Sequence, residues 1–152
     1  MKFEVQCDMT DGIVLVDPYF LEQMNEDILN AMNIYLDPQG ITELADDFPG
    51  EDWNDVYQRE TAPFKAFAEK GKLWIHLIEP CEKEFDLKET EALQSSEKVL
   101  VESGRLNVVL ASELLQCLYF PDLEMELLGE IEADNGCYNV GICDDTIGLK
   151  RA

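Results

Sequence analysis

Positive charge is missing from two long stretches of the chain, and this feature constrains the protein most strongly. No Lys or Arg occurs from Phe3 to Gln58, which holds 14 acidic residues, or from Leu106 to Leu149, which holds nine. The segment between them, residues 59–105, carries eight basic and ten acidic residues. Acidic charge that served only solubility would not need this segregation. We therefore interpret the two acidic segments as candidates for one negative face.

The composition is that of a folded chain. Its 152 residues are 46% hydrophobic and include seven Phe, five Tyr and two Trp. This content argues against a disordered acidic chain, and the length suits one domain over residues 1–152. No apolar run approaches the roughly 20 residues that cross a bilayer. We expect a single globular domain with no membrane partner.

The net charge of −22 restricts the partners. Phosphate backbones and anionic lipid surfaces repel such a chain, so direct nucleic-acid binding is not expected. A basic protein is the natural partner, because opposite electrostatic fields speed encounter and favour correct orientation. Charge that merely keeps the protein soluble remains the alternative. The oligomeric state is left open.

The cysteines do not form a disulfide framework. Five are present, an odd number at scattered positions, and two of them, Cys7 and Cys117, lie in apolar surroundings typical of small core residues. The first residues contain no apolar segment of the signal-peptide kind. We therefore expect reduced thiols and a cytoplasmic location.

Alternating hydrophobicity and turn residues predict strands joined as hairpins. Residues 3–7 and 13–16 flank a turn ending at Gly12, and residues 98–102 and 106–110 flank Ser103–Gly104. The sequence Asp134–Asn135–Gly136 predicts a third hairpin between residues 124–132 and 137–143. These patterns favour an α+β fold: a mostly antiparallel sheet of about five to seven strands, built from hairpins, with two to four helices packed on one side.

Helix signals fall in three places. Asp17 and Pro18 are typical of a helix start, and apolar residues from Phe20 to Met32 fit one helical face. Residues 41–70 have an aromatic stripe at helical spacing, which Pro63 should divide into two helices, with Gly71 ending the second. Ser112 should begin a short helix through Leu118.

No catalytic or metal motif stands out. His76 is the one histidine, and its expected strand gives it a face shared with Trp74 and Ile78. A structural role for His76 is favoured, because nothing selects one of five cysteines as its partner. Zinc and calcium ligand patterns are absent, as are nucleotide-binding glycine motifs. We expect no cofactor, no metal and no catalytic residue.

The candidate binding residues lie in one acidic segment without basic neighbours in sequence, and an aromatic side chain there would supply an anchor. They are Glu43, Asp46, Asp47, Glu51, Asp52, Trp53 and Asp55. In size and charge the chain is similar to bacterial immunity proteins against nuclease toxins and to protein mimics of DNA. This similarity implies a non-catalytic inhibitor that occludes a basic partner such as a nuclease toxin.

Two other functions stay open. One is a small-ligand-binding or enzymatic domain of unfamiliar type, with a cleft near His76. The other is a structural or accessory subunit of an oligomer, whose interface would use Phe120–Pro121 and the apolar residues 114–119. Both of these apolar segments could equally belong to the core.

Overall fold

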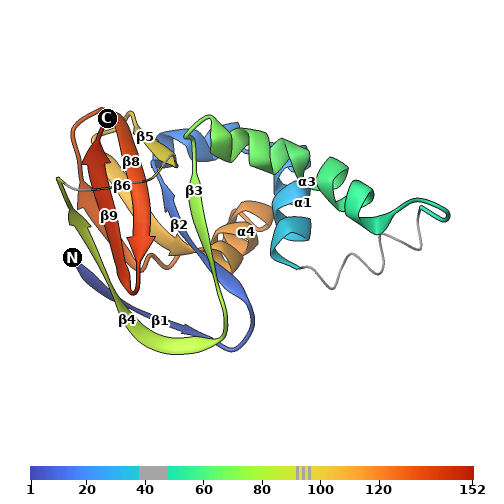
Figure 1. Ribbon diagram of the computed structural model, residues 1–152, viewed down its shortest axis with the longest axis horizontal. Helices are drawn as coiled ribbons and strands as arrows, with labels where there is room; N and C mark the ends of the chain where they lie inside the picture. The colour runs from blue at the N-terminus through green and yellow to red at the C-terminus, as the bar shows by residue number, and fades with distance from the viewer. Residues whose placement is uncertain (38–47, 92, 94, 96) are drawn as a thin grey trace.

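The chain forms three layers, two of strands and one of helices (Figure 1). The computed structural model describes residues 1–37, 48–91, 93, 95 and 97–152. One sheet has the strand order β1(Lys2–Cys7), β4(Cys81–Glu89), β9(Thr146–Arg151), β8(Gly136–Cys143) and β5(Lys98–Val101). The other has the order β3(Trp74–Ile78), β2(Asp11–Val16), β6(Arg105–Leu110) and β7(Gly129–Glu132).

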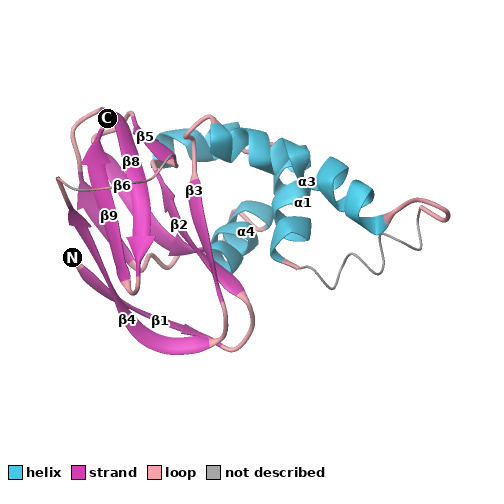
Figure 2. Cartoon of the chain, viewed as in Figure 1, coloured by secondary structure: helices cyan, strands magenta, loops and turns pink. Residues whose placement is uncertain are grey.

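The four-stranded sheet lies between the five-stranded sheet and the helices (Figure 2). The helical elements in the described residues are the 3-10 helix η1(Pro18–Gln23) and the α-helices α1(Glu26–Leu36), α3(Trp53–Glu69) and α4(Ala111–Tyr119). The α+β class and the mostly antiparallel pairing are therefore confirmed. The strands number nine in the described residues, beyond the expected five to seven, and they divide between two sheets.

Strand β2 is covered on both faces, and every one of its six residues is buried. Ile13 and Leu15 point into the core between the sheets, whereas Val14 and Val16 point into the core under the helices. Successive side chains of a strand point to opposite faces, so both faces must be apolar when both are covered. This explains the continuous run Ile13–Val16, which does not alternate with polar residues.

The three predicted hairpins are wrong in their pairing. The turn after β1 leads to β2 in the other sheet, and the turns between β5 and β6 and between β7 and β8 cross between sheets in the same way. Turn residues specify that the chain reverses, but they do not specify which strand it then pairs with. Strands β8 and β9 do form a hairpin, through Asp144 with a φ of 53° and Asp145.

The predicted helix start at Asp17 and Pro18 is confirmed. Asp17 precedes η1 and accepts a hydrogen bond from the Tyr19 amide at 2.9 Å, with Pro18 as the first helical residue. The apolar face that follows is divided, because η1 ends and α1 begins with Asn25 as a new cap. Helices η1, α1 and α4 all pack on the β2–β6 face of the four-stranded sheet.

Helix α3 continues through Pro63, so the predicted break there is wrong. Its buried residues Val56, Phe64 and Phe67 confirm the core-facing stripe. Pro63 has no N–H to donate to the carbonyl four residues earlier. Its side chain is exposed, and the burial of Thr61 and Phe64 beside it keeps the helix continuous. Gly71 ends the helix as predicted, with a φ of +82° that favours glycine.

Buried carboxylates at both ends of β2 connect it to other elements. At the start, Asp11 accepts hydrogen bonds from the amide and the hydroxyl of Ser112, and so caps α4 in the absence of a local side-chain cap. At the end, fully buried Asp17 accepts from the amides of Glu102 and Ser103 at 2.6 and 2.7 Å and from the Ser103 hydroxyl at 2.5 Å.

The Asp17 carboxylate makes stability depend on pH. Burial alone would raise the pKa of Asp17, but hydrogen bonds from Ser103, Tyr19 and Glu102 together lower this pKa below its usual value. A lowered folded-state pKa means that the ionised group stabilises the fold above its unfolded-state pKa. This contribution disappears as the pH falls through the folded-state pKa.

Replacing Asp17→Asn should lower the free energy of unfolding by about 2 to 3 kcal/mol near neutral pH, because the amide nitrogen cannot accept from the donors around it. The loss should shrink as the pH falls to about 3, below the usual pKa of an aspartate, because the unfolded wild-type chain then binds a proton at Asp17 that the folded chain binds only at lower pH. Urea unfolding at both pH values measures the effect. The exposed Asp8→Asn is the matched control and should change stability little. An equal loss at both pH values would contradict the role of the ionised carboxylate.

Replacing Pro63→Ala should stabilise the protein by about 1 to 3 kcal/mol, because the substitution restores a helical N–H donor at an exposed position. Thermal unfolding followed by circular dichroism measures the change in Tm. Ala62→Ser, on the exposed side of the same helix, should change stability by about 0.5 kcal/mol or less. A destabilised Pro63→Ala protein would mean that the proline ring itself supports α3.

Candidate functional site

The start of helix α3 collects four of the predicted binding residues. We call this group, Glu51, Asp52, Trp53 and Asp55, the acidic α3 start. All four side chains are exposed, and the Trp53 side chain is 55% exposed. The remaining predicted residues, Glu43, Asp46 and Asp47, lie outside the residues that the structure describes.

Asp52 has a structural role at this site. It is the N-cap of α3, and its carboxylate accepts a hydrogen bond from the Asn54 amide at 2.8 Å. A cap of this kind satisfies one of the free amides at a helix start, and both Asp52 and Asp55 complement the positive end of the helix dipole. Their charge therefore helps α3 to form at this position.

Glu51 is paired with a cation, contrary to what its sequence neighbours indicate. The Arg59 guanidinium lies 3.1 Å from the Glu51 carboxylate, and it also lies over the Phe48 ring at 5.0 Å from the ring centre. Arg59 is the first basic residue after the acidic segment, and the first two turns of α3 bring it back to Glu51. Asp55 is then the exposed carboxylate of the group with neither a cap role nor a cationic partner in the described part of the chain.

The acidic α3 start lies far from the sheets. In Figure 1, α3 extends away from the strands, and its N-terminal end is the more distant one. The C-terminal part of the helix carries its buried aromatic residues, Phe64 and Phe67. Trp53 falls on the same helical stripe in sequence, but the structure leaves it in solvent beyond the end of this core. An exposed tryptophan on an ordered helix is typical of a binding anchor.

A second exposed apolar surface follows α4. It consists of Tyr119, Phe120, Leu123 and Leu127, with exposed fractions of 40%, 64%, 46% and 37%, and we call it the α4–β7 surface. Exposed carboxylates alternate with these residues in the sequence, at Asp122, Glu124 and Glu126.

The α4–β7 surface has a defined backbone. The Leu123 amide donates to the Phe120 carbonyl at 3.0 Å, the Glu126 amide donates to the Glu113 carboxylate at 3.1 Å, and the Leu128 amide donates to the Val108 carbonyl at 2.7 Å. The Tyr119 hydroxyl donates to the Asn30 side chain of α1 at 2.7 Å. These apolar side chains are therefore presented to solvent by an ordered segment.

Sequence reasoning identified this surface only in part. Phe120 and Tyr119 are exposed as an interface would require, but Leu114 and Leu115, named with them, are buried in the helix-side core. Its alternation with glutamates predicts a strand at Leu127, but β7 begins only at Gly129. The signal for exposure was the acidic residue beside each apolar one, since buried strand faces rarely carry carboxylates.

His76 lies against Trp74, and their rings stack with centres 6.1 Å apart. The Trp74 indole N–H donates to the Glu97 carboxylate at 2.5 Å. Burial lowers the pKa of His76, and the nearby Glu97 carboxylate opposes this effect. A hollow of about 350 Å³ is lined by His76, Cys81 and Lys83, among other residues.

The His76 hollow does not assemble an activated thiol. Burial and the neighbouring Cys7 raise the pKa of Cys81, whereas a nucleophilic cysteine needs a lowered pKa. A larger hollow of about 580 Å³ lies beside α3 and β3, and its lining includes Tyr35, Trp74 and Glu97 but not His76. The expected cleft near His76 is thus separated from the larger hollow.

Among the residues that the structure describes, no group of three or more His, Cys, Asp or Glu side chains is placed to hold a metal ion. In the same residues, no helix is both long enough and apolar enough to cross a membrane. No protein-family model, curated protein or solved structure matches the chain.

The two tryptophans should differ in solvent access. Trp53 is 55% exposed and Trp74 is 3% exposed, so acrylamide should quench one emission component readily and the other weakly. Replacing Trp53→Phe should remove the readily quenched, red-shifted component. Fluorescence quenching of the two proteins measures this, with the unfolded proteins as controls for full exposure. Emission from Trp53→Phe that is quenched as readily as in the wild type would place the exposed indole at Trp74 instead.

Proposed function

We propose that this chain is a non-catalytic acidic protein that binds a basic protein partner in the cytoplasm, as an inhibitor of the immunity type. The observation that carries the proposal is the exposed side chain of Trp53 among the carboxylates of the acidic α3 start. Binding interfaces are enriched in tryptophan at their centres, and basic side chains complement the surrounding carboxylates.

Electrostatics supports a basic partner. Asp55 is exposed beside Trp53, and Glu51 and Asp52 add two further carboxylates, of which Arg59 neutralises one. Lys and Arg of a partner would form charge-assisted hydrogen bonds with the remaining oxygens. The net charge of −22 acts over a longer range, since it steers a basic protein toward the chain before contact.

The α4–β7 surface supports the same kind of partner. Phe120 and Leu123 would supply apolar contacts, and Asp122, Glu124 and Glu126 would supply charge around them. No Lys or Arg occurs in residues 106–149, so the segment itself offers no neutralising cation. Substitutions on each surface separately, with binding measured for each variant, will show whether the partner covers one surface or both.

Inhibition would then work by occlusion. A nuclease binds the phosphates of its substrate through a basic active site, and a protein that presents carboxylates to that site competes for the same cations. Such a complex needs no reaction by the inhibitor. Its association rate should fall as salt rises, because salt screens the long-range attraction.

The test is affinity capture from the native host at low ionic strength, followed by a salt gradient and mass spectrometry. We expect one stoichiometric basic protein to elute with salt. With that protein purified, the double variant Trp53→Ala/Asp55→Lys should bind about tenfold more weakly or worse, through loss of the anchor and reversal of one charge.

Glu4→Lys is the matched control, because it makes the same charge change as Asp55→Lys at an exposed position of β1, in the five-stranded sheet. Circular dichroism should show that both variants fold. If neither the double variant nor a Phe120→Ala/Leu123→Ala variant weakens binding more than Glu4→Lys does, neither surface is the binding site. If only ribosomal background is captured, the inhibitor proposal fails.

A further inference from the structure

Two cysteines that are far apart in the sequence lie opposite each other in the five-stranded sheet. Cys7 ends β1 and Cys81 begins β4, and the two are direct partners in the antiparallel register. Residues in this relation project from the same face of the sheet. The pair Phe3 and Phe85, two steps of two residues along the same face, stacks with ring centres 5.9 Å apart. Cross-strand contact is thus already established along this row.

The spacing of an antiparallel pair suits a disulfide. Opposite residues have Cα atoms about 4.5 to 5.5 Å apart, and disulfides join Cα atoms about 4.4 to 6.8 Å apart. The Cys7 thiol donates to the Glu79 carbonyl at 3.6 Å, two residues before Cys81, and the neighbouring Cys7 is one cause of the raised pKa of Cys81. Both are partly buried and pack against the core between the sheets. The two thiols are reduced in this structure.

The other cysteines are placed differently. Cys117 is buried in α4 and its thiol donates to the Glu113 carboxylate, while Cys137 lies within β8. Cys143 is exposed at the end of β8, beside the turn whose Asp145 pairs with Lys83 at 2.9 Å. Cys143 is therefore the competitor that a test must separate from the Cys7–Cys81 pair.

We propose that Cys7 and Cys81 form a reversible disulfide by exchange with a low-molecular-weight disulfide such as oxidised glutathione. This inference does not depend on the proposed binding function, because neither cysteine belongs to the acidic α3 start or the α4–β7 surface.

The exchange has two steps. One cysteine loses its proton, and its thiolate attacks a sulfur of oxidised glutathione. A protein–glutathione mixed disulfide forms, and one glutathione leaves as a thiolate that takes up a proton. The thiolate of the second cysteine then attacks the protein sulfur of the mixed disulfide and releases the second glutathione. Two electrons pass from the cysteine pair to the glutathione disulfide, and both protons end on the released thiols.

The groups around Cys81 determine the rate of this exchange, because they control how much of its thiol is ionised. Burial, the neighbouring Cys7 and the nearby Asp145 carboxylate raise the pKa of Cys81, and the Lys83 ammonium opposes this effect. Since the thiolate is the attacking species, the reaction should be slow near neutral pH and faster under mildly alkaline conditions. The pair is therefore expected to respond to sustained rather than brief oxidation.

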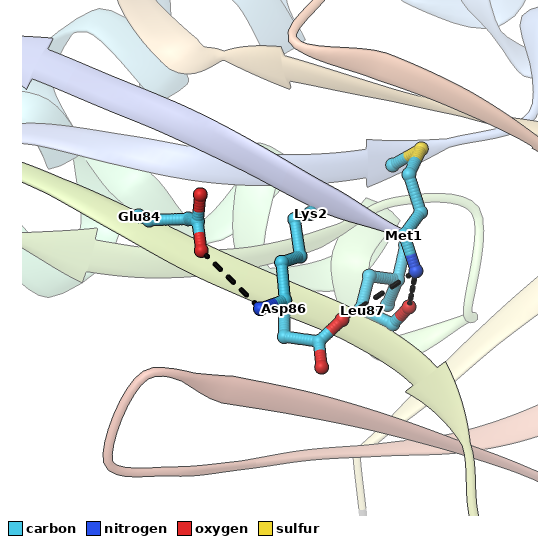
Figure 3. A network of polar contacts seen from close by, with 5 residues as sticks. All are labelled: Met1, Lys2, Glu84, Asp86 and Leu87. Atoms are coloured by element: carbon cyan, nitrogen blue, oxygen red, sulfur yellow. Dashed lines mark hydrogen bonds and ion pairs between the residues drawn. The ribbon is translucent and has the colours of Figure 1, made fainter.

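The crosslink would close the free end of the β1–β4 ladder. The opposite end is already held, because the Met1 ammonium donates to the Leu87 carbonyl at 2.7 Å and lies 3.4 Å from the Asp86 carboxylate (Figure 3). Lys2 and Glu84 add an exposed ion pair next to it. A disulfide between Cys7 and Cys81 also encloses a long loop, which restricts the unfolded chain.

The experiment incubates the full chain with a series of reduced and oxidised glutathione ratios at mildly alkaline pH. Free thiols are then blocked, and the protein is analysed intact and as non-reduced peptides by mass spectrometry. We expect two of the five thiols to become protected, a mass loss of two hydrogen atoms, and one peptide linking Cys7 to Cys81. The Tm should rise by roughly 5 °C or more, and reductant should reverse all three changes.

Matched variants assign the bond. Cys7→Ser and Cys81→Ser should each abolish the crosslink and accumulate a mixed disulfide at the remaining cysteine, whereas Cys137→Ser and Cys143→Ser should crosslink as the wild type does. A stable mixed disulfide on the wild-type pair would overturn the proposal. So would linkage of either cysteine to Cys143, or a disulfide-bonded dimer in place of the internal crosslink.

Discussion

The fold depends on strand β2, which lies between two apolar cores and has a buried carboxylate at each end, Asp11 at its start and Asp17 just after its last residue. Burial of both of its faces requires hydrogen-bond partners for its backbone and for the carboxylates at its two ends. Strands β3 and β6 pair with its backbone, while Asp11 and Asp17 accept amide hydrogen bonds from α4 and from the turn between β5 and β6. These carboxylates therefore set where the helix layer and the outer sheet attach to the central strand.

Acidic residues thus have two separate uses in this chain. Asp11, Asp17 and Asp52 accept hydrogen bonds from backbone amides at the starts of helices or turns, so their carboxylates stabilise the folded state. Most of the other carboxylates are in solvent, and the few exposed ion pairs leave the molecule strongly negative. Repulsion among them costs stability. The buried carboxylates offset part of this cost because each forms charge-assisted hydrogen bonds with backbone amides.

Local chemistry predicted the parts of the fold that depend on neighbouring residues. The α+β class, the helix start at Asp17 and Pro18, and the helix end at Gly71 all follow from such signals. The pairing of strands could not be predicted, because a turn such as Asp134–Asn135–Gly136 reverses the chain without choosing between two sheets. At the candidate site, Asp55 is exposed, as expected for a carboxylate in a segment without basic neighbours. The pairing of Glu51 with Arg59 depends on the path of α3.

The two candidate surfaces depend on different parts of the molecule. The acidic α3 start is organised locally, by the Asp52 cap and by the Glu51–Arg59 pair. The α4–β7 surface follows a helix whose start is held by Asp11, and Asp11 lies four residues after Cys7. A crosslink at Cys7 would restrain the turn that leads to Asp11, and so the start of α4.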